Sequence, residues 1–248
     1  MHFKTVQATA LKSTFEVLKD ILNDVNVIFT SEGLKILTLD TARVALVDLT
    51  LSADNFDEYE CSGEVIAGIN ITNTYKLLKT ITNNDVVTFD INDIESMNIK
   101  IENNVKKSST SFKLKLLDID DDRIQLPPVD MNVVTVMPSV DFQRINRDMN
   151  NISSDVCIHR NRDKFIISCE GDFANQDTVI DCGSDNEFTG SIKGVYSLKY
   201  VNLFTKATGM CSNVQIMQEE ANRFLVLKYN VADLGELRFY LSTKADEY

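Results

Sequence analysis

The sequence lacks the features that mark a membrane-spanning or fibrous protein. It contains no tryptophan, 3 prolines and 9 glycines among 248 residues, so little in the chain interrupts regular helices and strands. No apolar stretch approaches the roughly 18 residues of a membrane-spanning helix, which excludes a helical span. The hydrophobic content of 44% is nevertheless enough to fill a core. We therefore expect a globular protein with one large domain or two of ordinary size.

Paired cysteines and an export signal are also missing. The N-terminal segment has no charged stretch followed by an apolar core, so we expect no secretion. The five cysteines stand singly, without the short spacings of a zinc site or the even count of a disulfide framework. They are expected to serve as small buried hydrophobes: Cys61, Cys157, Cys169, Cys182 and Cys211.

Recognisable catalytic chemistry is absent from the sequence. The two histidines, His2 and His159, lie near no nucleophile motif, and the glycines form no phosphate-binding loop. Aspartates alternate at 118–122 as in a calcium loop, but Arg123 and Val129 replace the required glycine and glutamate. The sequence therefore predicts no enzyme, no catalytic residue, no metal site and no cofactor. A metal-dependent nuclease built on these carboxylates stays open as an alternative.

Alternating apolar and polar residues predict a chain made mostly of short strands. The clearest strands are 26–29, 34–39, 42–51, 86–91, 97–101 and 112–116. Apolar residues at helical spacing predict four helices, at 10–22, 72–81, 140–150 and 197–208. Ser139 or Asp141 is expected to cap the third helix, and Gly209 to end the fourth in a left-handed conformation.

The order of these elements repeats. A strand, helix, strand, strand series opens at Thr5–Ala8 and again at Thr135–Pro138, and each half then contains a second, shorter helix and a closing strand. An acidic stretch closed by two prolines separates the halves and is typical of an extended connector. We expect an α+β protein with two similar domains, 1–117 and 131–248, joined by a connector at 118–130.

The net charge of −12 disfavours a nucleic-acid partner at first sight. The four predicted helices, however, hold eight basic and four acidic residues, whereas the rest of the chain holds 17 basic and 33 acidic ones. In each helix the two cations lie three or seven residues apart, on one face. An ordinary solvated face explains one such helix but explains four poorly. We predict contacts with DNA phosphates, without reading of base sequence, by Lys12, Lys19, Lys76, Lys79, Arg144, Arg147, Lys199 and Lys206.

Four separated segments resemble one family over nearly the whole chain. They are LDTARVALVDLTL at 39–51, FQRINRD at 142–148, LFTKAT at 203–208 and YNVADLG at 229–235. In this order they are similar to the DNA sliding clamps of the proliferating cell nuclear antigen family, of eukaryotic or viral type. The resemblance implies the DNA clamp fold, with two helices on antiparallel sheets in each domain, in a homotrimeric ring of pseudo-sixfold symmetry. It also implies a processivity factor that encircles double-stranded DNA.

The resemblance further implies partners that carry a short motif with a glutamine, an aliphatic residue and two aromatics. Implied partners are DNA polymerase, the clamp loader, flap endonuclease and DNA ligase, without any membrane. The implied location is the nucleus for a cellular protein, and the host nucleus or a cytoplasmic replication site for a viral one. The implied peptide pocket consists of Leu39, Val44, Leu46, Ile124, Leu126, Pro127, Phe224, Tyr240, Leu241 and Ser242, with backbone contacts near Thr243.

The chain departs from the family pattern in two regions. Arg43 stands where histidine is common and Phe224 where proline is common, and both changes would reshape the pocket. The loop after 155–159 is short and carries Arg160 and Arg162, so the family's lysine modification is not expected there. A checkpoint-type clamp subunit, which assembles with different subunits rather than with itself, is the alternative function.

Overall fold

The computed structural model describes residues 1–120, 124, 126, 131–182, 188, 190–219 and 223–244. The chain forms two compact units. Unit 1 comprises residues 1–41, 47–124 and 230–237, and unit 2 comprises residues 42–46, 125–229 and 238–248. None of the helices in the described ranges combines the length and the apolar character that crossing a bilayer requires.

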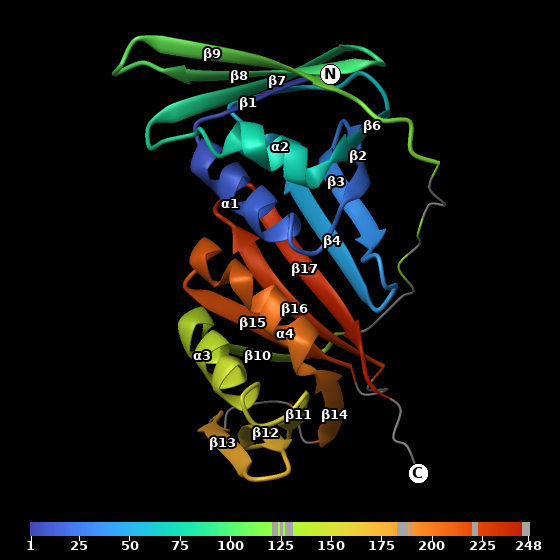
Figure 1. Cartoon of the computed structure of the whole chain (residues 1–248), viewed down its shortest axis with the longest axis vertical. Coiled ribbons are helices and arrows are strands. Elements are labelled where there is room, and N and C mark those ends of the chain that lie inside the picture. The colour runs from blue at the N-terminus through green and yellow to red at the C-terminus, as the bar shows by residue number, and fades with distance from the viewer. Residues whose placement is uncertain are drawn as a thin grey trace. The chain divides into compact units, whose positions relative to one another are not determined.

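Unit 1 is built from antiparallel strands in two sheets (Figure 1). One sheet has the order β5-β1-β7-β8-β9, with β1 (His2–Thr5), β5 (Glu58–Glu60), β7 (Asp85–Asp93), β8 (Ser96–Asn103) and β9 (Ser108–Lys115). The other strands follow the order β4-β3-β2-β6, with β2 (Asp24–Thr30), β3 (Gly33–Leu39), β4 (Ala45–Ser52) and β6 (Val65–Asn70). A short 3₁₀ segment, η1 (Ala53–Asn55), follows β4. Each strand predicted in this half is present, but the strand predicted at 42–51 begins at Ala45 and the one predicted at 112–116 ends at Lys115.

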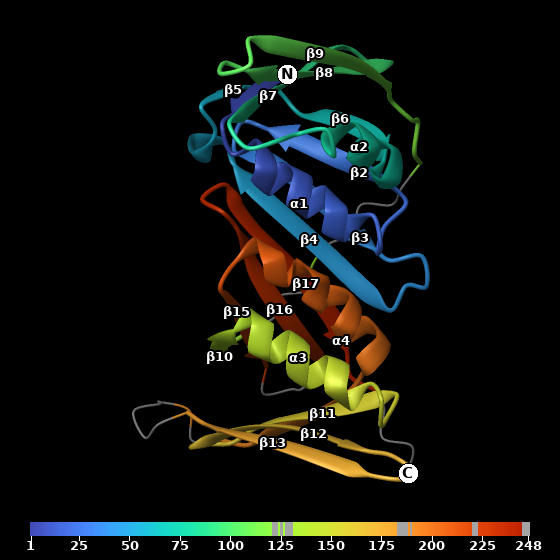
Figure 2. The same cartoon turned by 60° about the vertical axis from the view of Figure 1, so that its left-hand side comes forward.

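The two helices of unit 1, α1 (Ala8–Leu18) and α2 (Ile71–Leu78), pack side by side (Figures 1 and 2). The apolar stripe predicted for the first helix is buried, with Leu18 fully covered, although the helix ends there and not at Leu22. Asn70 begins α2 because its side-chain oxygen accepts a hydrogen bond from the Asn73 N–H at 2.9 Å.

Unit 2 repeats the plan of two sheets and a helix pair (Figure 2). One sheet has the order β13-β12-β11-β14, with β11 (Asp155–Arg160), β12 (Lys164–Glu170), β13 (Asn175–Asp181) and β14 (Ile192–Ser197). The other strands follow the order β10-β15-β16-β17, with β10 (Val133–Pro138), β15 (Asn213–Gln218), β16 (Phe224–Val231) and β17 (Gly235–Ser242). The helices are α3 (Ser139–Met149) and α4 (Leu198–Phe204), the latter extended by the 3₁₀ segment η2 (Thr205–Met210). The predicted α+β architecture is confirmed.

Stacked aromatic rings hold helices and strands together in each core. Phe3 of β1 stacks on Phe89 of β7 with ring centroids 4.6 Å apart. Phe204, at the end of α4, stacks on Phe239 of β17 at the same centroid distance. Burying a side chain of this size contributes about 1.5–3 kcal/mol. The second contact fixes α4 against its sheet and leaves the opposite helix face to the solvent.

Both predictions about the helix ends of unit 2 are wrong. No side chain caps α3: the buried Ser139 hydroxyl has no hydrogen-bond partner, and Asp141 instead pairs with Arg144 at 3.2 Å. Gly209 lies inside η2, and Gly33 is the glycine with positive φ in the described ranges. The last turn tightens into a 3₁₀ helix, which satisfies the terminal carbonyls without a left-handed residue.

The prediction that the cysteines are buried holds for Cys169 alone. The other four are half-buried. Cys157 lies on the open face of β11, where burial pattern and strand alternation place it opposite the core. Cys61, Cys182 and Cys211 follow directly after β5, β13 and η2, where ends of elements meet solvent.

Candidate nucleic-acid interface and partner-binding surface

The four predicted cations of unit 1 differ in the exposure of their side chains and in the contacts that these make. Lys76 and Lys79 are exposed on α2 and at its end. Lys12 of α1 is half-buried and its ammonium donates to the Ile81 carbonyl at 2.9 Å. That bond joins α1 to the segment that follows α2. The Lys12 ammonium must therefore break this hydrogen bond before it can bind a phosphate.

Lys19, at the end of α1, is also engaged. Its ammonium lies 3.0 Å from the Asp20 carboxylate and 5.3 Å from the centre of the Tyr75 ring. The Tyr75 hydroxyl donates to Glu16 at 2.8 Å, and this hydrogen bond raises the pKa of Tyr75. The contacts orient Lys19 over α2 rather than into open solvent.

All four predicted cations of unit 2 are exposed. Arg144 pairs with Asp141 at 3.2 Å, and Arg147 lies 3.8 Å from Asp148 with 72% of its side chain exposed. Lys199 lies 5.7 Å from the centre of the Tyr200 ring, and Lys206 is exposed on η2. Exposed ion pairs contribute at most about 1 kcal/mol, so these side chains can exchange a carboxylate for a phosphate at little cost.

Part of the predicted peptide pocket comes together in unit 2. Val44 directly precedes β4 and Leu46 lies near its start, whereas Tyr240 and Ser242 lie near the end of β17; the two strands are neighbours in the sheet. Val44 is 40% exposed, whereas Tyr240 is 8% exposed. Leu241 is fully covered, so the accessible surface of this group is supplied by the other side chains.

The remaining predicted pocket residues are spread over the chain. Leu39 and Ile124 belong to unit 1 and are half-buried; Leu126 and Phe224 belong to unit 2 and are also half-buried. Pro127 lies outside the described residues. Arg43 adopts a left-handed conformation with φ of 59° in the turn before β4, which directs the chain from β3 into that strand.

The structure reveals a pocket of about 520 Å³ in unit 1 that sequence reasoning missed. The start of the connector covers the open face of β2, β3 and β6: Leu117 N–H donates to Gly68 O at 2.8 Å, and the Asn26 amide donates to Ile119 O at 3.1 Å. A Cβ on Gly68 would lie 2.1 Å from the Leu117 oxygen, so glycine is required there. The lining residues are Asn26, Ile28, Lys35, Leu37, Ile66, Gly68, Leu117, Asp118, Ile119, Asp120 and Ile124.

The signal for this pocket was present in the sequence. Ile28, Leu37 and Ile66 occupy the outward positions of strands whose inward positions are also apolar, which indicates a sheet with something lying on both faces. Alternation by itself predicts only that these segments are strands. The segment that covers their outer face cannot be identified without the fold.

Arg160, which was expected in the loop after 155–159, is the last residue of β11 and has an unexpected role. Arg160 is 1% exposed, and its guanidinium donates to the carbonyls of Asn161, Arg162 and Lys164. The side chain therefore holds the turn between β11 and β12 from inside. Arg162 is the exposed cation of this turn, which contains no lysine at 161–163.

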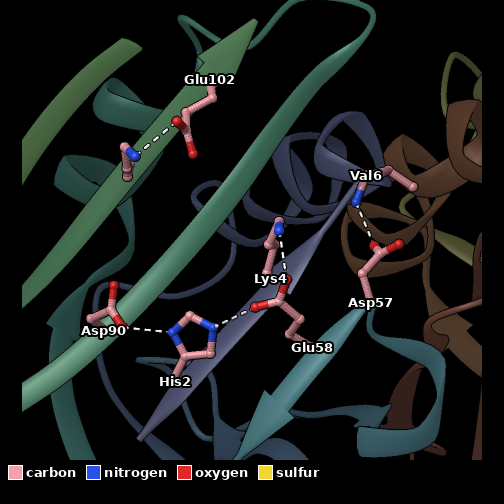
Figure 3. Close-up of polar contacts among 8 residues, drawn as sticks. His2, Lys4, Val6, Asp57, Glu58, Asp90 and Glu102 are labelled. Atoms are coloured by element: carbon pink, nitrogen blue, oxygen red, sulfur yellow. Dashed lines mark hydrogen bonds and ion pairs between the residues drawn. The ribbon is translucent and has the colours of Figure 1, made fainter. Parts of the chain in front are cut away.

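His2 belongs to an ion-pair network on β1, β5 and β7 (Figure 3). Its Nδ1 lies 2.7 Å from Asp90 and its Nε2 lies 3.3 Å from Glu58, which also pairs with Lys4 at 2.5 Å. The hydrogen bond to Asp90 raises the pKa of His2, more than burial lowers it, with a further contribution from Glu58. Both nitrogens of the ring are thus engaged by carboxylates (Figure 3).

The chain repeats one α+β plan twice, and its helix pairs expose cations although the chain as a whole is acidic. These features together define the class of DNA sliding clamps. Residues 1–124 match the family model described as proliferating cell nuclear antigen, N-terminal domain, and residues 125–244 match its C-terminal domain. A relative from Paramecium bursaria Chlorella virus 1, described as probable DNA polymerase sliding clamp 1, is 36% identical over 255 residues. The match covers 97% of this chain and 95% of that relative.

The chain therefore belongs to the proliferating cell nuclear antigen family. Its function is that of a clamp that serves as a processivity factor in DNA replication. The family resemblance inferred from four sequence segments is confirmed.

Proposed function

We propose that this chain assembles as a homotrimeric ring that encircles duplex DNA and tethers DNA polymerase to it. The observation that carries the proposal is the separation of charge: in a chain with net charge −12, five cations lie in the four helices, Lys19 and Lys79 directly follow α1 and α2, and Lys206 lies in η2. Positive charge that faces a central hole would attract phosphates, and the acidic remainder would discourage DNA from binding elsewhere.

Sliding follows from the kind of contact the helices offer. Lys and Arg side chains contact phosphates through flexible stems and carry no information on base sequence. Each register along the duplex is then equivalent, so the ring moves while it stays on the DNA. Retention comes from the closed shape and not from tight binding, and the clamp needs no catalytic residue of its own.

Two similar domains, 1–117 and 131–248 with a connector at 118–130, are the proposed repeating parts of the ring. The free edges of two sheets support head-to-tail joining, since β9 and β13 each end the strand order of their sheet. The exposed residues of β9 include Lys113 and Lys115, whereas those of β13 include Asp177 and Asp181. Opposite charges on two open edges favour pairing between β9 of one copy and β13 of the next.

The proposed partners are proteins with short peptide motifs: DNA polymerase, the clamp loader, flap endonuclease and DNA ligase. Their proposed docking site is the part of the implied pocket that unit 2 holds: Val44, Leu46, Leu126, Phe224, Tyr240, Leu241 and Ser242. The viral relative supports a place of action at a replication site in a host cell, and the nucleus is one such site.

Solution mass and retention on DNA test the ring. The full chain is expected to have the mass of a trimer and, after loading, to remain on closed circular duplex but to leave linear duplex. Linear duplex with protein-blocked ends is the matched control and should retain the clamp. Equal retention on open linear and circular DNA, or a monomer at micromolar concentration, would contradict the proposal. If the chain forms a ring-sized assembly only when it is mixed with different subunits, the result would favour a checkpoint-type clamp.

A further inference from the structure

The two residues that follow β17 are hydrogen-bonded on both sides within unit 2. Thr243 N–H donates to Arg223 O at 3.1 Å, and Lys244 N–H donates to Val195 O at 2.9 Å. The Lys244 ammonium also lies 2.5 Å from the Asp155 carboxylate. The backbone predicted to receive a partner peptide is therefore held in place by its own unit.

Arg223, on the first of these two sides, is itself fixed by a buried carboxylate. Glu219 directly follows β15 and is 3% exposed. It accepts hydrogen bonds from the Arg223 backbone N–H at 3.1 Å, from Nε at 3.1 Å and from Nη2 at 2.9 Å. The planar fork of arginine matches both carboxylate oxygens, and such charged pairs are stronger than neutral hydrogen bonds. The Arg223 backbone and side chain are thus both held by one carboxylate.

The fixed arginine lies between two parts of the proposed peptide surface. It directly precedes Phe224, the first residue of β16, and its guanidinium carbon lies 6.0 Å from the centre of the Phe224 ring. Its carbonyl receives the Thr243 N–H. A change in the position of Arg223 would therefore move both the Phe224 ring and the Thr243 backbone of that surface.

We propose that Arg223 is a positioning residue: held by Glu219, it keeps Phe224 and the Thr243 backbone in the arrangement that a bound peptide meets. This role rests on the proposed function, because it concerns how the docking surface is prepared. A surface that is ordered beforehand spares the peptide the entropy of ordering it. The geometry of the guanidinium fork, and not its charge alone, sets the arrangement.

The test measures fluorescence anisotropy of a labelled synthetic peptide that contains a glutamine, an aliphatic residue and two phenylalanines. The full-length chain and its Arg223→Gln variant are titrated into it. Loss of the guanidinium contacts that hold Arg223 in place is expected to weaken binding about tenfold. Arg223→Lys, which keeps the charge but loses the fork, is expected to weaken binding as well. Binding by Arg223→Lys equal to that of the wild type would overturn the role of the fork.

A double variant separates positioning from general damage. Arg223→Gln leaves the Glu219 carboxylate buried without its guanidinium donors, whereas Glu219→Gln combined with Arg223→Gln places two neutral amides together. Since an unpaired buried charge costs more than a neutral pair, the double variant should bind better than Arg223→Gln alone. Arg162→Gln is the matched control, because that exposed arginine lies 3.9 Å from Asp163; its binding should equal that of the wild type.

The outcomes distinguish the two proposals. No binding by the wild type would overturn the peptide surface and, with it, the role of Arg223. Binding by the wild type together with equal affinity in Arg223→Gln would overturn only the role of Arg223. The mass of the assembly and its retention on circular DNA should be unchanged in each variant, since neither depends on Arg223.

Discussion

At the scale of single residues, the network around His2 makes part of the stability of unit 1 depend on pH. The hydrogen bond to Asp90 raises the pKa of His2 above its ordinary value of 6.5. The stabilisation is therefore fully present below pH 6.5 and is lost as the pH rises through the folded-state pKa. We expect His2→Gln to lower the thermal midpoint at about pH 6 and to change it much less at about pH 9.

Thermal unfolding followed by circular dichroism at both pH values checks this expectation. His159→Gln is the matched control, because the His159 ring contacts the neutral Ser191 hydroxyl at 2.9 Å. An equal loss of stability at both pH values in His2→Gln would show that the ring acts by packing alone.

Asp85 has the opposite pH dependence. Burial by itself would raise the pKa of Asp85, but hydrogen bonds from the Thr82 N–H and hydroxyl and from the Asn103 amide outweigh it and lower the pKa below 3.8. The stabilisation is present above pH 3.8 and is lost as the pH falls through the folded-state pKa. Asp85→Asn should cost about 1.5–3 kcal/mol at neutral pH, measured by urea unfolding.

A second aspartate provides the comparison for that measurement. Asp93 accepts hydrogen bonds from the Ser96 hydroxyl at 2.8 Å and from the Glu95 N–H at 3.0 Å, but it is exposed. Asp93→Asn should therefore cost clearly less than Asp85→Asn. A difference between Asp85→Asn and the wild type that persists undiminished into strong acid would contradict the assignment.

At the scale of helices and strands, the eight cations should not contribute equally to DNA contact. Lys79 is exposed, whereas Lys12 donates to Ile81 O. Lys79→Ala should weaken contact with DNA and reduce the slope of log affinity against log salt by about one per copy. Lys12→Ala should change that slope less but lower the thermal midpoint, because it removes a bond between α1 and the segment after α2.

Salt titration on linear duplex with blocked ends measures both variants. Lys164→Ala, which removes an exposed lysine of β12, is the control and should leave the slope unchanged. A larger change of slope for Lys12→Ala than for Lys79→Ala would show that the Lys12 contact with Ile81 gives way to phosphate in the complex.

Element positions could be predicted well from periodicity, and element ends could not. The strand 34–39 and the buried face of α1 were predicted because apolar spacing reports directly on burial. Helix ends depend on single hydrogen bonds. Asn70 caps α2, but Ser139 fails to cap α3 because it is already the first helical residue. No spacing rule distinguishes these two situations.

At the scale of the whole molecule, the sequence reports on charge patterning more directly than on contacts between distant segments. The helix cations could be identified because charge patterning is a property of the chain itself. The pocket below Leu117 and Ile119 could not, since it arises where residues 117–120 cross strands from far earlier in the chain. The buried state of Arg160 is likewise a consequence of the turn it closes. Long-range contacts create the pocket, whereas Arg160 is held by carbonyls one to four residues further along the chain.

The open edges of β9 and β13 give the last prediction, which concerns assembly. Alternation places Lys113 and Lys115 on one face of β9, and Asp177 and Asp181 on one face of β13. Changing both lysines to glutamate would set like charges against each other in every pairing of the two edges. Each such pair costs about 0.2–1 kcal/mol, repeated at every contact between copies. We expect this variant to dissociate to monomers at concentrations where the wild type is a trimer, as measured by native mass spectrometry.

Inverting both edges in one chain tests whether charge pairing is the cause. A variant with Lys113→Glu, Lys115→Glu, Asp177→Lys and Asp181→Lys has opposite charges on its own edges again and should recover the trimer. Mixed with a tagged wild type, it should not co-purify, because glutamates then face aspartates and lysines face lysines. Recovery of the trimer together with free mixing would mean that the edges pair through the backbone alone. A folded, inverted chain that stays monomeric would place the contact between copies on some other surface.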